Sequence, residues 1–434
     1  MAGLFAALLA AVVSVSTDRG AALEHRATLP PDEQRFAFYS TVEHIDPEGR
    51  EAAKIAFKLS MASASPAPVL EHCVPQDLSP TLMFFDLRLM QFSEADWHSL
   101  IAGDPYRQAQ HTSLPLCSGA DWLTIQLSDQ KRNPIYYRLI FGGKIPPTRD
   151  DALDWLGVNR TPSLRVAMIE GASQIASNPA AIRFIENLPI SRGSAWGTRD
   201  VKTLTAHRDP LERLDGTFEH DAEEWIVHRR KTCLRTHREG ALAAYFLANG
   251  QGQIQNFAPV DIVRDAHAMF RDSFEIRVPG GCIACHQSGY NLPSKNELIE
   301  ENLAGVDRFA KYENQVEIES KLYADLKKHF TRGNEDYAIA VEDGIGCKPV
   351  TAAASFQLCT ARYDEPVTLA TAARELYVSP AELREVIALE SNRPATPMTT
   401  RVAGLAHDRT IPRESFEEAW QALWFLLHKW EPKK

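Results

Sequence analysis

Two cysteines and a histidine near the middle of the chain have a spacing that suits covalent cofactor chemistry. Cys282 and Cys285 are three positions apart, and His286 follows directly. In a helical turn the two thiols share one face, and Cys-x-x-Cys-His is the attachment signature of a c-type haem. The thiols would form thioethers with the haem vinyl groups, and His286 would take the proximal position on the iron. The pattern predicts one covalently bound haem c.

Three other interpretations of the motif stay open. A thioredoxin-like redox pair needs a preceding strand and a following helix, and residues 276–281 offer a short strand at best. A zinc site needs further ligands at matching spacing, and the sequence holds no second Cys-x-x-Cys. A disulfide between Cys282 and Cys285 would leave His286 without a role. Haem attachment uses all three residues.

The sixth iron ligand would decide what such a haem does. Methionine or histidine there gives a low-spin electron carrier, whereas an open position permits ligand binding or peroxide chemistry. Met398 lies in a Pro-rich segment downstream of the motif, and His220 is followed by Asp221, which could orient its ring. Met269 and His267 lie just upstream. Each of these residues is also an ordinary core methionine or surface histidine in the simplest interpretation.

The N-terminus predicts export. Residues 4–15 are an unbroken run of apolar and small side chains with the length of a signal-peptide core, too short to cross a bilayer comfortably. We therefore assign residues 1–23 to a signal peptide or N-terminal anchor, although the terminal amine is the one positive charge before this run. A periplasmic or envelope-associated protein follows, with membrane association only through this segment. The net charge of −10 argues against nucleic acid as a partner and favours a basic redox protein.

Length and composition predict an α+β protein of two or three domains. The chain has 434 residues, of which 44% are hydrophobic and 24% charged. We expect a linker over 18–31 and then three regions. They are a mixed α/β domain of unknown role at 32–190, a β-rich middle region at 191–275, and a helical, cytochrome c-like haem domain at 276–434.

Local patterns predict individual elements. Alternating or strand-forming residues indicate strands at 81–90, 122–127, 136–141 and 225–228, and apolar periodicity indicates helices at 150–156 and 180–188. A hairpin is expected from 244–248 to 254–260 through Asn249-Gly250. Ser-x-x-Glu capping boxes begin at residues 294, 379 and 415. The last helix carries a stripe typical of a core, formed by Phe416, Trp420, Leu423, Trp424 and Leu427.

The other cysteines allow two disulfides in an oxidising compartment. Cys347–Cys359 and Cys73–Cys117 are the pairs we would expect, with Cys233 left over. The alternative is that all five are buried small apolar residues.

From about residue 196 onward the order of features resembles exported monohaem cytochrome c-domain proteins of planctomycete type. The matching pieces are a Phe-Glu-His-Asp segment at 218–221, Gly240 followed by Tyr-Phe-Leu at 245–247, Asp-Ile-Val at 261–263, the haem motif, and a tail through 335–337 and 367–376. The chain departs from the group in its extra cysteines and in an arginine-rich stretch at 228–237. The resemblance implies haem binding and electron transfer and no defined substrate.

Three functions are compatible with these features. The first is a monohaem carrier of single electrons, for which no catalytic residue is assigned. The second is a haem enzyme, peroxidase-like or oxidase-like, since a simple carrier needs only about one small domain. The third is a haem-based sensor or binding module that uses the N-terminal domain.

Overall fold

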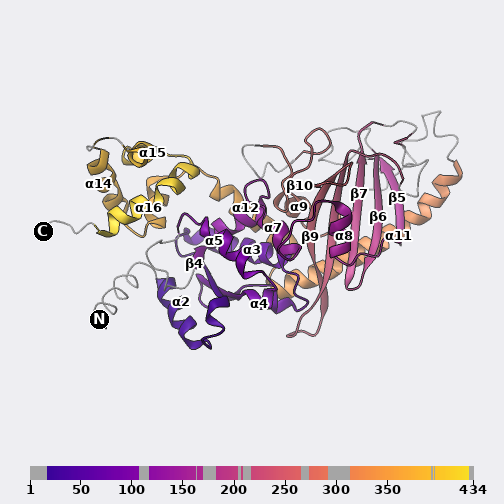
Figure 1. Ribbon diagram of the computed structural model, residues 1–434, viewed down its shortest axis with the longest axis horizontal. Coiled ribbons are helices and arrows are strands. Elements are labelled where there is room, and N and C mark those ends of the chain that lie inside the picture. Colours follow the sequence, from indigo (N-terminus) through magenta and orange to yellow (C-terminus); the bar gives the residue numbers. More distant parts are fainter. Residues whose placement is uncertain are drawn as a thin grey trace.

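The chain forms an α+β structure with two β-sheets and two main apolar cores. The computed structural model describes residues 17–106, 117–162, 164–169, 182–203, 207–208, 217–264, 273–291, 313–391, 394 and 396–429. Figure 1 shows the larger sheet at one end of the molecule and the last helices at the other.

The smaller sheet belongs to the N-terminal region. Its strands lie in the order β2 (Gln76–Asp77), β3 (Leu82–Asp86), β1 (Ala37–Thr41) and β4 (Cys117–Gly119). The helices around it are α2 (Thr17–Thr28), α3 (Pro47–Ala64), α4 (Leu87–Met90), α5 (Glu94–Ala102), α6 (Ala120–Ser128) and α7 (Ile135–Ile140). Helix α3 begins where the Asp46 carboxylate accepts the Gly49 amide at 2.9 Å, which is a favourable N-cap.

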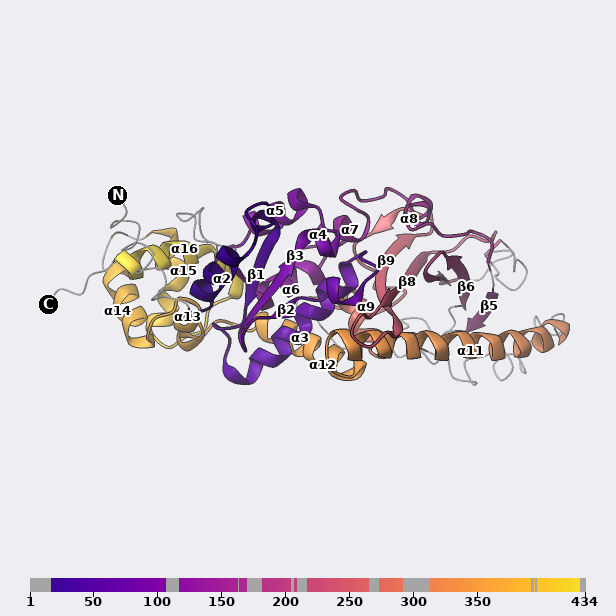
Figure 2. The ribbon, with the colours of Figure 1, turned by 90° about the horizontal axis from the view of Figure 1, so that it is seen from below.

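The larger sheet is an antiparallel meander of six strands. They are β5 (Leu164–Ile169), β6 (Ile182–Ile190), β7 (Gly193–Val201), β8 (Ala222–Thr232), β9 (Glu239–Asn249) and β10 (Ile254–Gln255), each paired with the next. Helix α11 (Glu313–Gly344) runs along one face of this sheet, and α8 (Arg149–Trp155) lies near the other face (Figure 2).

Two cations of strand β8 join the sheet to helix α3. The last carbonyl groups of a helix have no partner within it. The Arg229 guanidinium donates to the Ser63 carbonyl at 2.8 Å, and the Lys231 ammonium donates to the Ser65 carbonyl at 2.9 Å. The arginine-rich stretch of the sequence thus begins as a strand that closes the end of a helix, and both elements share one apolar core.

The C-terminal helices have a core of their own. After α12 (Pro349–Tyr363) come α13 (Leu369–Glu375), α14 (Pro380–Ser391), α15 (Pro397–Ala406) and α16 (Arg413–Lys429). The predicted stripe on α16 is confirmed, with Phe416, Trp420 and Leu423 all buried in this core. The predicted capping box at residue 379 is confirmed as well, because Ser379 and Glu382 each accept the other's backbone amide, at 3.2 and 2.8 Å.

Several local predictions are wrong. The segments 122–127 and 136–141, expected as strands, are the helices α6 and α7, and 180–188, expected as a helix, contains strand β6. Helix α6 is buried almost all round, so the alternation of its side chains carries no information about a solvent-facing side. Helix α16 begins at Arg413 rather than at the box expected from residue 415. The box at residue 294 lies outside the described residues.

The regional boundaries also differ from those expected. The larger sheet continues across residue 190, because β6 and β7 pair along their whole length. Helices α11 and α12 pack on the first core, so the separate helical core starts only near residue 367. The linker expected at 18–31 is largely helix α2, which begins within the segment assigned to the leader. Its Asp18 is buried and accepts hydrogen bonds from the hydroxyls of Thr41 and Thr81.

Two further observations concern the cysteines and the membrane. All seven cysteines are free thiols, so neither expected disulfide is present. Among the described residues, no helix combines the length and the apolar character that crossing a bilayer requires.

Candidate functional site

The structure brings the three motif residues together. Helix α9 (Gly280–Cys285) is six residues long and contains both cysteines, and His286 is its C-cap. The Cys282 side chain is 1% exposed, and Cys285 and His286 are half-buried. All three line one hollow of about 30 Å³ beneath strands β8 and β9.

Backbone pairing and a buried ion pair hold the motif in place. The segment before α9 pairs with residues 256–258 in a short antiparallel ladder. Within it, the Arg277 guanidinium bonds the Asp129 carboxylate at 2.7 Å, and both side chains are buried. Gly281 is required by close approach, since a Cβ there would lie 2.6 Å from the Ile276 side chain. The start of the motif helix is therefore fixed by residues from two distant parts of the chain.

The His286 ring is oriented at both nitrogens. Its Nδ1 lies 3.1 Å from the Gly289 carbonyl, and since a carbonyl only accepts, Nδ1 is the donor. Its Nε2 lies 3.3 Å from the Glu224 carboxylate, and the ring stacks on Tyr245 with 6.1 Å between centroids. A histidine that ligates a metal usually donates its other nitrogen to a carbonyl in this way. The geometry leaves Nε2 as the nitrogen available to a metal.

The electrostatics of the hollow favour an uncharged sulfur. Burial raises the pKa of the Cys282 thiol well above its ordinary value, and the nearby Glu224 charge raises it further. Burial also opposes ionisation of Glu224, but the charge and hydrogen bond of His286 outweigh it and lower the carboxyl pKa. Redox cysteines and zinc ligands work as thiolates. A buried thioether carries no charge, so this position suits a thioether better than a thiolate.

Strand β8 places a second histidine on the same face as Glu224. His228 is 2% exposed, and neither ring nitrogen has a hydrogen-bond partner among the described residues. Burial, helped by the charge of His286, lowers its pKa to about 3. The ring stacks on Tyr290 at 4.1 Å between centroids. The sequence offered a signal for it, because residues at 224, 226 and 228 share one face of a strand.

The two predicted distal ligands that the structure describes, His220 and Met398, do not lie at His286. The His220 Nε2 lies 2.5 Å from the carboxylate of Glu223, which points to the opposite face of the sheet from Glu224. Met398 lies in α15 and packs against the C-terminal core, at the far end of the molecule (Figure 1). Met269 and His267 lie outside the described residues.

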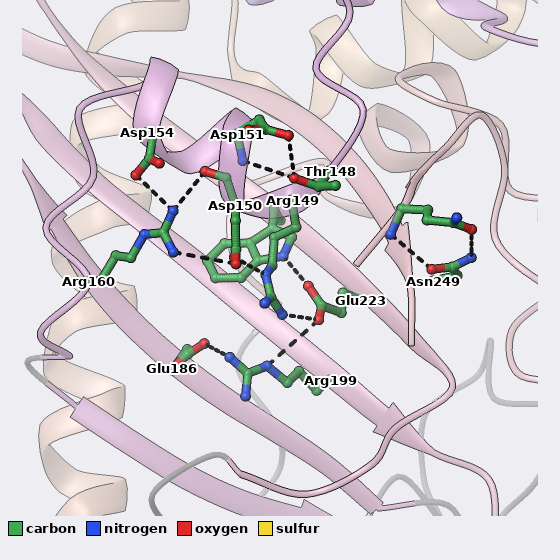
Figure 3. A network of polar contacts seen from close by, with 12 residues as sticks. Thr148, Arg149, Asp150, Asp151, Asp154, Arg160, Glu186, Arg199, Glu223 and Asn249 are labelled. Atoms are coloured by element: carbon green, nitrogen blue, oxygen red, sulfur yellow. Dashed lines mark hydrogen bonds and ion pairs between the residues drawn. The ribbon is translucent and has the colours of Figure 1, made fainter. Parts of the chain in front are cut away.

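Glu223 is the centre of a buried polar network (Figure 3). Its carboxylate lies 2.5 Å from the Arg149 guanidinium and 2.9 Å from the Trp225 indole nitrogen. Arg199, 3.9 Å from the same carboxylate, also pairs with Glu186. These contacts fasten helix α8 to the sheet, so the role of His220 here is structural.

The residue types at the motif suit a covalent haem, but the volume of the hollow does not. Two thiols and an anchored imidazole share one wall, which is the set that thioether attachment and proximal ligation need. The hollow of about 30 Å³ has room for little more than a water molecule, whereas ligand pockets enclose roughly 300–1,000 Å³. The described walls therefore do not enclose a porphyrin, and residues 265–272 and 292–312, which flank the motif, lie outside the described residues.

In the part of the chain that the structure describes, no group of three or more His, Cys, Asp or Glu residues, the motif residues included, is arranged so that it could hold a metal ion by side chains alone. The chain matches no protein-family model, no curated protein and no solved structure.

Proposed function

We propose that this chain is an exported monohaem c-type cytochrome that passes single electrons to or from a redox protein. Cys282 and Cys285 hold the porphyrin through thioethers, and His286 Nε2 is the proximal ligand. The haem, when bound, supplies an iron that changes its charge by one unit.

One observation supports this proposal above all. Cys282, Cys285 and His286 all line the same hollow, and the Nδ1 of His286 already donates to the Gly289 carbonyl. A dithiol redox interpretation has to ionise a buried thiol whose pKa is raised. A zinc interpretation lacks further side-chain ligands among the described residues. The haem interpretation leaves both sulfurs neutral and uses each of the three residues.

The chain's own residues would set the surroundings of the iron. Glu224 contacts the ligating nitrogen, so this contact has to give way when iron takes its place. A bound iron would supply a positive charge near the Glu224 carboxylate. The ring of Tyr245, on strand β9, stacks against the imidazole.

The test is covalent attachment itself. The protein is produced with haem-maturation machinery, and its intact mass and reduced absorption spectrum are compared with those of Cys282→Ser/Cys285→Ser. We expect one haem per wild-type chain and none on the double variant. Cys347→Ser, which changes a half-buried thiol on another part of the fold, serves as the control and should keep the haem. A wild-type chain without added mass contradicts the proposal.

A second candidate is a haem enzyme or sensor that binds a small ligand at the iron. It is supported by the positions of His220 and Met398, both of which lie away from His286. Carbon monoxide binding to the reduced protein distinguishes the two. Rapid binding to a high-spin iron favours the enzyme or sensor, and a low-spin spectrum that carbon monoxide leaves unchanged favours the carrier.

A further inference from the structure

A larger hollow lies away from the haem motif, where the first core meets the C-terminal helices. It encloses about 360 Å³ and is lined by the turn before α3, the start of α6, the end of α12, the α13 region and the first residue of α16. That volume is in the range of small-molecule sites, which often form where two domains meet. We call it the seam pocket. The proposed cytochrome function makes no use of it.

An aspartate-oriented histidine lines the seam pocket. The Nε2 of His44 lies 2.9 Å from the Asp121 carboxylate, which also accepts the Trp122 amide at 2.9 Å. Burial opposes charging of His44, but Asp121 outweighs it and raises the pKa of the imidazole. No described residue pairs with the Nδ1 of His44. The imidazole is therefore held by one nitrogen and keeps the other for a ligand, as acid–base histidines do.

Guanidinium groups line the same space. Arg413 is tied to Glu375 by two bonds of 2.8 Å; the Glu375 side chain is buried, and the Arg413 side chain is 10% exposed. Arg362 lies 3.2 Å from the Asp46 carboxylate that caps α3, and Arg374 stands exposed on the rim. Arg362 reaches over the start of α3, where a Cβ on Gly49 would lie 2.5 Å from its Nη1.

The lining offers charges of both signs to a ligand. The pairs formed by Arg413 and by His44 are already balanced within the protein. On the rim, Arg374 is positive, Glu48 and Glu365 are negative, and all three are exposed. A ligand with one charge meets a like charge on one side, which costs affinity. A ligand with both charges can use both sides.

The surroundings of the pocket's thiol oppose its ionisation. Cys359 lines the seam pocket, but burial raises its pKa far above the ordinary value, and the thiolate needed for attack is suppressed. The pocket therefore has the features of a binding site with a proton-exchanging histidine and lacks an activated nucleophile.

We propose that the seam pocket binds a small zwitterion of the amino-acid class. Its carboxylate lies toward Arg374 and Arg362, its ammonium toward Glu48, and the Nδ1 of His44 meets a polar group of the bound molecule. This site is independent of the haem.

Isothermal titration calorimetry on the haem-loaded full-length protein tests this. L-Alanine, L-glutamine and L-phenylalanine are the zwitterionic probes, and acetate and methylammonium carry one charge each. We expect at least one zwitterion to bind, and both singly charged probes to bind more weakly by about tenfold or more, since a hydrogen bond to a charged group is worth roughly that factor. Failure of haem attachment would leave this experiment intact on the haem-free chain.

Three variants locate the binding. Arg374→Gln removes an exposed charge and should weaken binding about tenfold. Gly49→Ala introduces a better helix former, and its Cβ displaces the Arg362 guanidinium, so it should also weaken binding. Arg384→Gln, an exposed arginine of α14 outside the pocket, is the matched control and should bind as the wild type does. The proposal is overturned if no zwitterion binds, if acetate binds equally well, or if Arg374→Gln and Gly49→Ala both keep full affinity while circular dichroism shows them folded.

Discussion

Replacement of His228 by phenylalanine should make the larger sheet less sensitive to acid. The histidine is buried, and its pKa falls from the ordinary 6.5 to about 3, chiefly through burial. A base with a lowered pKa in the folded state contributes stability above pH 6.5, and that contribution is lost as the pH falls toward 3. Between pH 7 and pH 4.5 the unfolded imidazole gains a proton that the folded one refuses. This difference costs about 2.5 kcal/mol of unfolding free energy.

The measurement is the unfolding free energy of wild type and His228→Phe at pH 7 and pH 4.5. Because the C-terminal helices have a separate core, hydrogen exchange of β8 and β9 amides under increasing urea is the appropriate readout. Phenylalanine keeps the ring stack on Tyr290, and any packing cost appears equally at both pH values. We expect the variant to lose about 2.5 kcal/mol less than wild type on acidification, whereas the exposed control His407→Gln should behave as wild type. Equal losses in wild type and His228→Phe would refute the reasoning.

Four further predictions concern buried charges and the C-terminal core. Glu223→Ala should lower the unfolding free energy by about 1–3 kcal/mol, because the buried Trp225 indole N–H loses its acceptor and, among the described residues, Arg149 keeps only Asp150 as a partner. Urea denaturation would show it, and an unchanged free energy would contradict it. Burial lowers the pKa of Lys231 from 10.5 to about 8. Between pH 8 and pH 10 the unfolding free energy of wild type should therefore rise by about 2 kcal/mol relative to that of Lys231→Met, as measured by denaturation at each pH. A difference between the two proteins that is the same at both pH values would contradict this. Trp420→Ala should cost about 3–5 kcal/mol in the C-terminal core alone, and exchange that quickens equally in β8 would argue against separate cores. On the haem-loaded chain, Glu224→Gln should raise the reduction potential, because a nearby carboxylate stabilises the ferric state. The corresponding change in the free energy of reduction is on the order of 1–2 kcal/mol. Voltammetry measures the potential, and a lowered value would contradict this.

The predictable parts of the fold are those in which sequence neighbours decide the structure. Strand β9 turns back into β10 as expected, although the turn runs from Asn249 to Gln253 rather than through two residues. Gly250 is needed there for another reason, since a Cβ would lie 2.0 Å from the His220 carbonyl. The stripe on α16 was recognisable because one side of that helix faces solvent. Helix α6 was not, because its burial on nearly every side erases the periodicity that distinguishes a helix from a strand.

The residues of the candidate site also divide into those that the sequence could predict and those that it could not. The motif residues are close in sequence, and one helical turn brings them together whatever the rest of the fold does. Glu224 could not be assigned to them, because it reaches His286 from a strand 62 residues away. His220 was assigned to the iron because its local pairing could not be read from the sequence. His220 lies three residues before Glu223, and that local pairing holds it on the opposite face of the sheet.

Successive carboxylates on strand β8 connect the architecture to the site. Neighbouring residues of a strand point to opposite faces, so Glu223 meets Arg149 on one side and Glu224 meets His286 on the other. A shift of one residue in the pairing of β8 would exchange the two faces and bury each carboxylate away from its partner. A buried charge without a partner costs several kcal/mol, so the two acids together oppose such a shift. The ion pairs around Glu223 therefore help to determine which face of the sheet carries Glu224. They thereby help to place the Glu224 carboxylate on the side where it contacts His286.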